Sequence, residues 1–283
     1  MKFKAAMMDF DGTVTKKGSV VPSKMMIKKL IELAKNVPVA FCTGRQLESF
    51  QKRGLKEILK EIPKVGGENI LGNIFLIGEN GSIGYYFDKK KCDYREFYRA
   101  KWPDKFIGKK RLKSELADKI SKYGEIINVH RVVVVMRAYH LNDSPIKEVY
   151  KKSSKMFKIC GKYLEEHDQN YEKYLHLGDS GIGVIICPAD GDKDTGIKKF
   201  AEYLAKKRKM KFSKNFKEIL VVGDSAKKGG NDYYFLQGKY GTPFTVGYYN
   251  PKNKHPSPVM DHKSKRLLYD AGTLRLLEHI FQI

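Results

Sequence analysis

The stretch that decides the fold is Phe3-Lys4-Ala5-Ala6-Met7-Met8-Asp9-Phe10-Asp11-Gly12-Thr13. The segment from Phe3 to Met8 is a short, mainly apolar run, which is typical of a strand buried on both faces of a parallel sheet. Asp9 then falls at the carboxyl end of that strand, followed by a turn. In open α/β sheets, ligands bind beyond the carboxyl ends of the strands, so the sequence predicts a polar site at Asp9 and Asp11.

The segments that follow predict a β-α-β-α order. Ser23 can cap a helix that runs to about Lys35, since apolar residues recur there at helical spacing. After this helix come an apolar strand at residues 37–41, a polar turn, a second helix to about residue 59 and a third strand at residues 74–77.

A second domain is predicted after Glu79-Asn80-Gly81, where the composition shifts toward aromatic and charged residues. Residues 85–188 are expected to form an inserted α+β cap, with strands such as 131–138 and 183–187. The first pattern then resumes, with helices at about 195–207 and 271–281 and strands at 219–222 and 244–247. We therefore predict an α/β fold: a doubly wound parallel-sheet (Rossmann-like) core at 1–84 and 189–283, with a cap at 85–188.

Polar side chains recur where the predicted core strands end. Thr43 follows the second strand, and Asp224 ends the strand after the insert. The carboxylates of Asp9 and Asp11 would repel each other unless a cation lay between them. Mg²⁺ prefers such oxygen ligands and often joins a carboxylate to a substrate phosphate. A solvated turn is the simpler interpretation of residues 9–13, but the buried strand before them and the second acidic strand end favour a metal site.

Composition limits the classes of protein that fit. The 283 residues carry a formal charge of +23, from 55 basic and 32 acidic side chains. The lysines are scattered along the chain, which favours a solvated basic surface and anionic small-molecule substrates over a nucleic-acid groove. No apolar run is long enough to span a bilayer, and the four cysteines form no C-x-x-C pair. We expect a cytoplasmic protein with no membrane partner.

Four ordered motifs carry a family resemblance: Asp9-Phe10-Asp11-Gly12-Thr13, Cys42-Thr43-Gly44-Arg45, Lys193, and Gly223-Asp224-Ser225 followed by Asn231-Asp232. In this order they resemble the motifs of the haloacid-dehalogenase-like phosphatases, and the resemblance extends over the whole chain. Glu79-Asn80-Gly81 after a strand, with an insert of this size between the second and third motifs, resembles the subgroup with a C2-type cap. That subgroup includes Cof-like sugar phosphatases, sucrose-phosphate and trehalose-phosphate phosphatases, and phosphomannomutases.

The resemblance implies a role for each motif residue. Asp9 would be the nucleophile that forms an aspartyl-phosphate, and Asp11 would be the general acid and base. Thr43 would bind the transferring phosphoryl oxygens, and Lys193 would supply a fixed positive charge. Mg²⁺ would be held by Asp9, Asp224 and the main-chain carbonyl of Asp11.

Several assignments have competitors. Thr43 could instead cap the following helix. Lys198 is a rival for Lys193, because the subgroup usually has Lys-Gly where this chain has Lys193-Asp194-Thr195-Gly196. The fourth motif is longer than usual, so either Asn231 or Asp232 reaches the outer shell of the metal, or the two begin a helix. Asp192 and Asp194 are weaker candidates for the site.

Substrate contacts are predicted at Gly44, Arg45, Asn231 and Arg137. Other cap residues on or beside predicted strands are further candidates, each with a plain structural role as the competing interpretation: His130, Arg131 and His176. Trp102 is expected to pack in a core.

The function predicted from the sequence is Mg²⁺-dependent hydrolysis of a small phosphate monoester, with a sugar phosphate inferred from the cap type alone. A phosphomutase uses the same pair of aspartates and is one alternative. The charge of +23 keeps a second alternative open, a phosphatase of polynucleotide ends or a nucleic-acid-binding protein. A catalytically silent scaffold is disfavoured because all four motif residues Asp9, Asp11, Thr43 and Asp224 are present.

Overall fold

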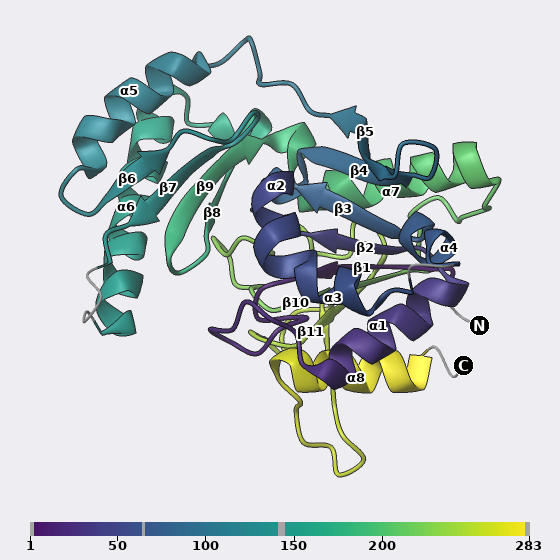
Figure 1. Ribbon diagram of the computed structural model, residues 1–283. Coiled ribbons are helices and arrows are strands. Elements are labelled where there is room, and N and C mark those ends of the chain that lie inside the picture. The colour runs from purple at the N-terminus through teal and green to yellow at the C-terminus, as the bar shows by residue number, and fades with distance from the viewer. Residues whose placement is uncertain (1–2, 64–65, 141–144, 281–283) are drawn as a thin grey trace.

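A computed structural model describes residues 3–63, 66–140 and 145–280. Within these residues the chain forms an eight-stranded sheet and a four-stranded sheet (Figure 1). The strands of the larger sheet are β1 Ala5–Asp9, β2 Val39–Cys42, β3 Ile74–Gly78, β4 Ile83–Asp88, β5 Asp93–Arg99, β10 Ile219–Gly223, β11 Thr242–Thr245 and β12 Ser257–Pro258. Their order is β12-β11-β10-β1-β2-β3-β4-β5, and the strands from β12 to β3 run parallel.

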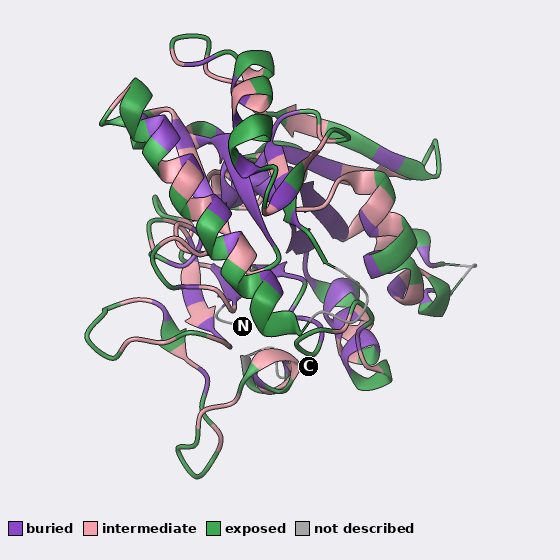
Figure 2. Cartoon of the chain, turned by 90° about the vertical axis from the view of Figure 1, so that its left-hand side faces the viewer, coloured by how far each residue is buried: buried purple, intermediate pink, exposed green. Residues whose placement is uncertain are grey.

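Helices cover both faces of the larger sheet. They are α1 Lys24–Asn36, α2 Leu47–Phe50, α3 Lys56–Glu61, α4 Glu68–Gly72, α7 Lys193–Arg208 and α8 Tyr269–Ile280. Successive side chains of a strand point to opposite faces, and β1 demonstrates this. Its Met8 packs in the cluster that contains α1, α3, α4 and α8, whereas its Met7 packs in the cluster that contains α7. All five residues of β1 are buried, as expected for a strand covered on both sides. Figure 2 shows the central strands in the colour of buried residues.

The start of α1 agrees with the sequence prediction. The hydroxyl of Ser23 accepts a hydrogen bond from the backbone N–H of Met26 at 3.2 Å, which satisfies one of the free donors of the first helical turn. The second predicted helix is instead divided into α2, a π-helical turn at Gln51–Leu55 and α3. The closing helix was predicted to reach Phe281, which lies outside the described residues; α8 is described to Ile280.

The smaller sheet belongs to the cap. Its strands are β6 Gly124–Ile127, β7 Val134–Ala138, β8 Leu175–Asp179 and β9 Gly183–Pro188, and they pair antiparallel in the order β6-β7-β9-β8. Helices α5 Lys109–Ile120 and α6 Ile146–His167 pack on this sheet around a separate core. The cap lies beside the edge of the larger sheet at which its parallel strands end (Figure 1).

The start of the insert differs from the predicted boundary at residue 85. Strand β4 pairs antiparallel with β3, and β5 pairs antiparallel with β4, so the larger sheet continues to Arg99. The aromatic and charged residues that suggested a new domain form the edge strands of the core, where one face of the strand meets solvent. At the other end, β9 stops at Pro188 and the core resumes. No helix in the described residues is long and apolar enough to cross a membrane.

Candidate active site

Asp9 and Lys193 meet at the carboxyl edge of the parallel sheet. Asp9 is the last residue of β1, Lys193 is the first residue of α7, and the lysine Nζ lies 2.7 Å from Asp9 Oδ1. Both side chains are buried, the lysine completely. The rival Lys198 lies one turn further along α7, half-exposed, with its Nζ 3.9 Å from Glu202. The structure therefore brings Lys193, and not Lys198, to Asp9.

Asp232 completes the buried ion network. Its Oδ1 lies 2.6 Å from Lys193 Nζ, and its Oδ2 accepts hydrogen bonds from the backbone N–H groups of Asp224 and Ser225 at 3.0 and 3.1 Å. Burial opposes the positive charge on Lys193, but the carboxylates of Asp232 and Asp9 outweigh it and raise the pKa of the lysine. Asp232 thus fixes both the lysine and the loop that carries Asp224.

Three carboxylates gather at this point. Each of Asp9, Asp224 and Asp232 offers one oxygen, and these oxygens lie within 4.8 Å of one another. Burial, with only partial compensation by Lys193, raises the pKa of Asp9 to about 7. Burial and the neighbouring Asp232 and Asp9 raise the pKa of Asp224 to about 8. One ammonium group does not neutralise three acids, and a divalent cation bound by oxygen ligands would supply the missing charge.

Asp11 faces away from this cluster and is half-exposed. Arg45 grips its carboxylate through two hydrogen bonds, with Nη2 at 2.6 Å and Nε at 3.1 Å. Partial burial raises the pKa of Asp11, and the guanidinium opposes that rise. Asp11 and the predicted substrate residue Arg45 are therefore brought together, at the rim of the site.

Thr43 and Gly44 follow β2 at the same edge of the sheet as Asp9. Thr43 is buried directly after β2, and its hydroxyl accepts the backbone N–H of Arg45 at 3.3 Å. The alternative that Thr43 caps the next helix is wrong, because the N-cap of α2 is Gln46. A Cβ added to Gly44 would lie only 2.8 Å from the Ile185 side chain of β9, so the turn and the cap sheet are in close contact.

The sequence marks Glu79-Asn80-Gly81 as a domain boundary and as part of the resemblance to the C2-capped subgroup, and in the structure this turn also supports the site. All three residues have positive φ angles, which are unfavourable for Glu79 and Asn80. The Asn80 amide donates to Asp192 Oδ1 at 2.8 Å. A Cβ on Gly81 would lie 2.4 Å from the Asp192 carbonyl oxygen, so glycine permits this close approach. The turn thereby holds the residue that precedes Lys193.

Asp192 and Asp194 do not join the carboxylate cluster. Asp192 is the N-cap of α7 and accepts the backbone N–H of Lys193 at 2.6 Å. Its other oxygen lies 2.9 Å from Nδ1 of His176. Asp194 pairs with Lys239 at 3.1 Å. Both acids position α7.

The polar residues predicted on the cap have other partners. Arg137 is exposed and pairs with Glu125 at 2.6 Å, and the Arg131 guanidinium pairs with Glu96 at 2.6 Å. His176 stacks on Tyr234 with ring centroids 3.7 Å apart. His130 is half-buried, with Nδ1 unpaired among the described atoms. The remaining prediction on the cap, packing of Trp102, agrees with its contacts to the cap core.

The lengthened fourth motif bridges the core and the cap. The backbone N–H of Asp179, at the end of β8, donates to the Gly229 carbonyl at 2.7 Å. Asn231 lies against Gly178, whereas Asp232 turns inward to Lys193. Residues 231–236 form turns and no helix, so the alternative of a helix start is wrong.

Solved structures with the same fold show which fold class carries this arrangement of residues. A haloacid dehalogenase-like hydrolase from Bacteroides thetaiotaomicron superposes with a TM-score of 0.56 at 14% identity, over 99% of this chain and 100% of that chain. The chain has the haloacid-dehalogenase-like fold. Other structures that share this fold include the N-terminally truncated IMP-nucleotidase of Plasmodium falciparum, with a TM-score of 0.61, 14% identity and coverage of 98% and 71%.

The C-terminal domain of the trehalose-6-phosphate phosphatase of C. albicans also shares the haloacid-dehalogenase-like fold, with a TM-score of 0.60, 13% identity and coverage of 98% and 92%. No protein-family model and no curated protein sequence matches the chain. The fold class predicted from the sequence and the fold of the resembled family are therefore confirmed by structure, at sequence identities that carry the fold alone.

Proposed function

We propose that the protein is a Mg²⁺-dependent phosphatase that hydrolyses a small phosphate monoester through an aspartyl-phosphate on Asp9. The observation that carries the proposal is the position of Asp9 at the end of β1, with Oδ1 bound to the buried ammonium of Lys193 at 2.7 Å. Among the described residues, its Oδ2 has one long hydrogen-bond contact, at 3.4 Å, with the hydroxyl of Thr13. One oxygen is thus anchored while the other is free to attack.

The residues present fit a magnesium ion. Asp9, Asp224 and Asp232 converge to within 4.8 Å, and burial, together with the repulsion from neighbouring carboxylates, keeps the pKa of Asp9 and Asp224 raised. Both oxygens of Asp232 already accept hydrogen bonds, so Asp9 and Asp224 are the residues that would hold the ion, together with the main-chain carbonyl of Asp11. Bound there, Mg²⁺ would offset the negative charge of the carboxylates and of the substrate phosphate.

The chain's own groups then account for both half-reactions. Asp9 Oδ2 forms a bond to phosphorus as the bond from phosphorus to the leaving oxygen breaks, and Asp11 donates a proton to that oxygen. In the second step Asp11 takes a proton from water, whose oxygen attacks the phosphorus and returns Asp9 as a carboxylate. Lys193 and the hydroxyl of Thr43 stabilise the charge on the transferring group.

The ion pair between Arg45 and Asp11 affects the protonation of Asp11 before the substrate binds. The two N–H donors of Arg45 stabilise the charged form of Asp11 and oppose the protonation that burial favours. We expect the substrate's phosphate to compete for the Arg45 guanidinium and release Asp11 to accept a proton. Gly44 and Asn231 remain proposed substrate contacts through their places at the core–cap boundary.

The substrate is proposed to be a sugar phosphate, and the cap to be of the C2 type. An antiparallel sheet with two helices, inserted between β5 and α7, supports this choice of cap. The neighbours' names mention a mononucleotide and a sugar phosphate, so both classes belong in any test. The phosphomutase and the polynucleotide-end phosphatase are the competing functions.

The test is phosphate release from a panel of sugar phosphates, mononucleotides and phosphorylated oligonucleotides, with Mg²⁺ or with EDTA. Wild type is compared with Asp9→Asn and with Asp88→Asn, a matched change of the last residue of another core strand. We expect metal-dependent release that falls more than about 10⁴-fold in Asp9→Asn and is unchanged in the control. Absence of release by a folded wild type from every substrate would contradict the proposal, and release that requires a bisphosphate activator would identify a mutase.

A further inference from the structure

A cleft lies between α7 and the edge strand β5. This cleft has a volume of about 870 Å³, within the usual range for small-ligand sites. Lys193 and Lys206 lie at opposite ends of α7, roughly 20 Å apart along the helix axis at 1.5 Å per residue. The Lys206 end of the cleft is therefore remote from Asp9, and a phosphate bound there is not the one that Asp9 attacks.

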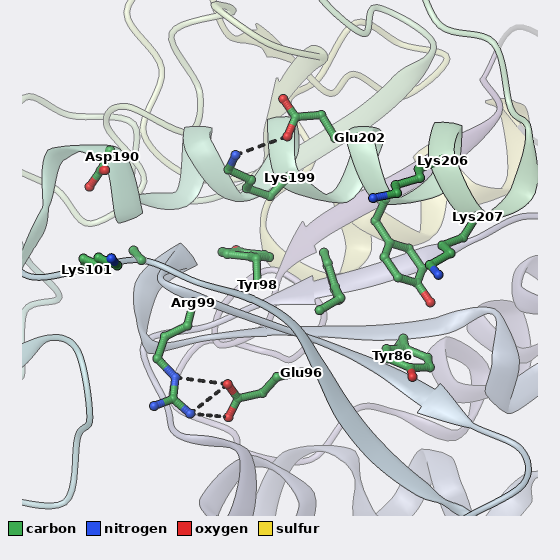
Figure 3. A pocket seen from close by; sticks show the side chains of 13 residues that line it. Tyr86, Glu96, Tyr98, Arg99, Lys101, Asp190, Lys199, Glu202, Lys206 and Lys207 are labelled. Atoms are coloured by element: carbon green, nitrogen blue, oxygen red, sulfur yellow. Dashed lines mark hydrogen bonds and ion pairs between the residues drawn. The ribbon is translucent and has the colours of Figure 1, made fainter.

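Cations dominate the polar lining of the cleft. Its lining includes five basic side chains and three acidic ones: Arg99, Lys101, Lys199, Lys206 and Lys207, against Glu96, Asp190 and Glu202. Two of the bases are already neutralised, because Arg99 pairs with Glu96 at 2.7 Å and Lys199 with Glu202 at 3.2 Å. Figure 3 shows the Arg99 pair on the side of β5 that faces away from α7.

The other three lysines have no acidic partner in the described part of the chain. Lys206 and Lys207 project from α7, and Lys101 follows β5 (Figure 3). All three are exposed, and the one remaining acid, Asp190, lies at the opposite end of the cleft from Lys206 and Lys207. Adjacent unpaired ammonium groups repel each other, and an anion with more than one charge would relieve that repulsion.

Aromatic rings form the apolar part of the lining. Tyr86, Phe97, Tyr98 and Tyr203 are half-buried, and each packs on a neighbouring ring at centroid distances from 4.5 to 5.5 Å. Half-buried rings beside lysines provide a surface for a planar group as well as for charge. A simple inorganic anion would use only the lysines.

We propose that the cleft binds a nucleoside diphosphate, with the phosphates at Lys206 and Lys207 and the base against the rings around Tyr86. This ligand combines the two features that the cleft offers, a compact multiple negative charge and a planar aromatic group. The proposal concerns a binding site and is independent of the proposed phosphatase reaction.

The test is calorimetric titration of the whole protein with adenosine diphosphate in EDTA. We expect one site, weakened by at least about tenfold in Lys206→Gln/Lys207→Gln. The double variant Lys158→Gln/Lys162→Gln removes the same charge from exposed positions of α6 and should bind like wild type. Asp9→Asn should also bind like wild type, since the active site takes no part.

Two further titrations test the ligand class. Tyr86→Leu should weaken adenosine diphosphate about fivefold or more while leaving pyrophosphate unchanged. Wild type should bind pyrophosphate more weakly than adenosine diphosphate. Absence of binding, equal affinity for the two ligands, or loss of binding in Asp9→Asn with retention in Lys206→Gln/Lys207→Gln would each overturn the proposal.

Discussion

The two ends of helix α7 put the same residue type to opposite uses. At the N-terminus, Lys193 is completely buried and lies within 2.7 Å of two carboxylates. At the C-terminal end, Lys206 and Lys207 are exposed and have no acidic partner among the described residues. A buried ion pair is costly to break, whereas an exposed charge costs little to remove. A lysine is therefore a fixed part of the structure at the N-terminal end of α7, whereas the lysines at its C-terminal end are available to a ligand.

The largest expected difference between the two ends of α7 is in stability, when Lys193→Met is compared with Lys206→Met. Lys193→Met leaves Asp9 and Asp232 buried without a counter-charge, so it should lower the free energy of unfolding by about 3–5 kcal/mol and abolish phosphate release. Lys206→Met should change stability by less than about 0.5 kcal/mol. Urea unfolding of both variants measures the difference, and equal stability of the two would show that the buried network is not as the structure has it.

The acidic cluster should also make stability depend on pH and metal. Asp9 and Asp224 have a folded-state pKa of about 7 and about 8, above the value of an exposed aspartate. The unfolded chain therefore releases these protons first as the pH rises, and the metal-free protein should lose stability from about pH 4 to about pH 8. Below that window both states hold the protons and the loss is absent.

The matched change is Asp224→Asn, which removes one of these carboxylates. In EDTA it should raise the melting temperature at pH 8 and flatten the pH dependence, and it should reduce the stabilisation that Mg²⁺ gives to wild type. A melting temperature that rises from pH 5 to pH 8 in EDTA would contradict the raised pKa values. Lys206→Met should leave the pH profile unchanged.

The smallest expected difference between the two ends of α7 is in their response to salt concentration. Mobile ions screen exposed charges far more than buried ones. Binding of adenosine diphosphate to the cleft should weaken steadily as sodium chloride is raised, while the free energy of unfolding contributed by Lys193, measured as the difference between wild type and Lys193→Met, should stay nearly constant. A salt-independent affinity would mean that the lysines of the cleft do not contact the phosphates.

Much of the core could be predicted because local patterns specify it. The apolar run before Asp9 and the hydroxyl of Ser23 correspond to β1 and to the start of α1. The edge strands β4 and β5 were assigned to the cap, because a strand with one solvent-facing side carries charged residues that look like a change of domain. Their place depends on the pairing of β4 with β3 and of β5 with β4, which residue composition does not encode.

The positions of site residues that end a strand could be predicted from the sequence. The positions of residues that depend on contacts with segments distant in sequence were harder to predict. The place of Asp9 and Asp224 follows from strand ends. The inward turn of Asp232 does not, since it depends on how residues 226–230 fold against β8 of the cap. The signal for Glu79 was a polar turn after a buried strand, and nothing local revealed its partners on the cap.

Through those partners, the Glu79 turn attaches the cap to the core. The Glu79 carboxylate accepts the backbone N–H groups of Arg131, Val132 and Val133 at 2.8, 2.7 and 3.2 Å, which clamps the entry to β7 onto the core. These hydrogen bonds occupy residues that were predicted to be strand and keep them outside it. The cap is therefore fastened to the core at a point beside Asn80 and the start of α7, in addition to its two covalent connections.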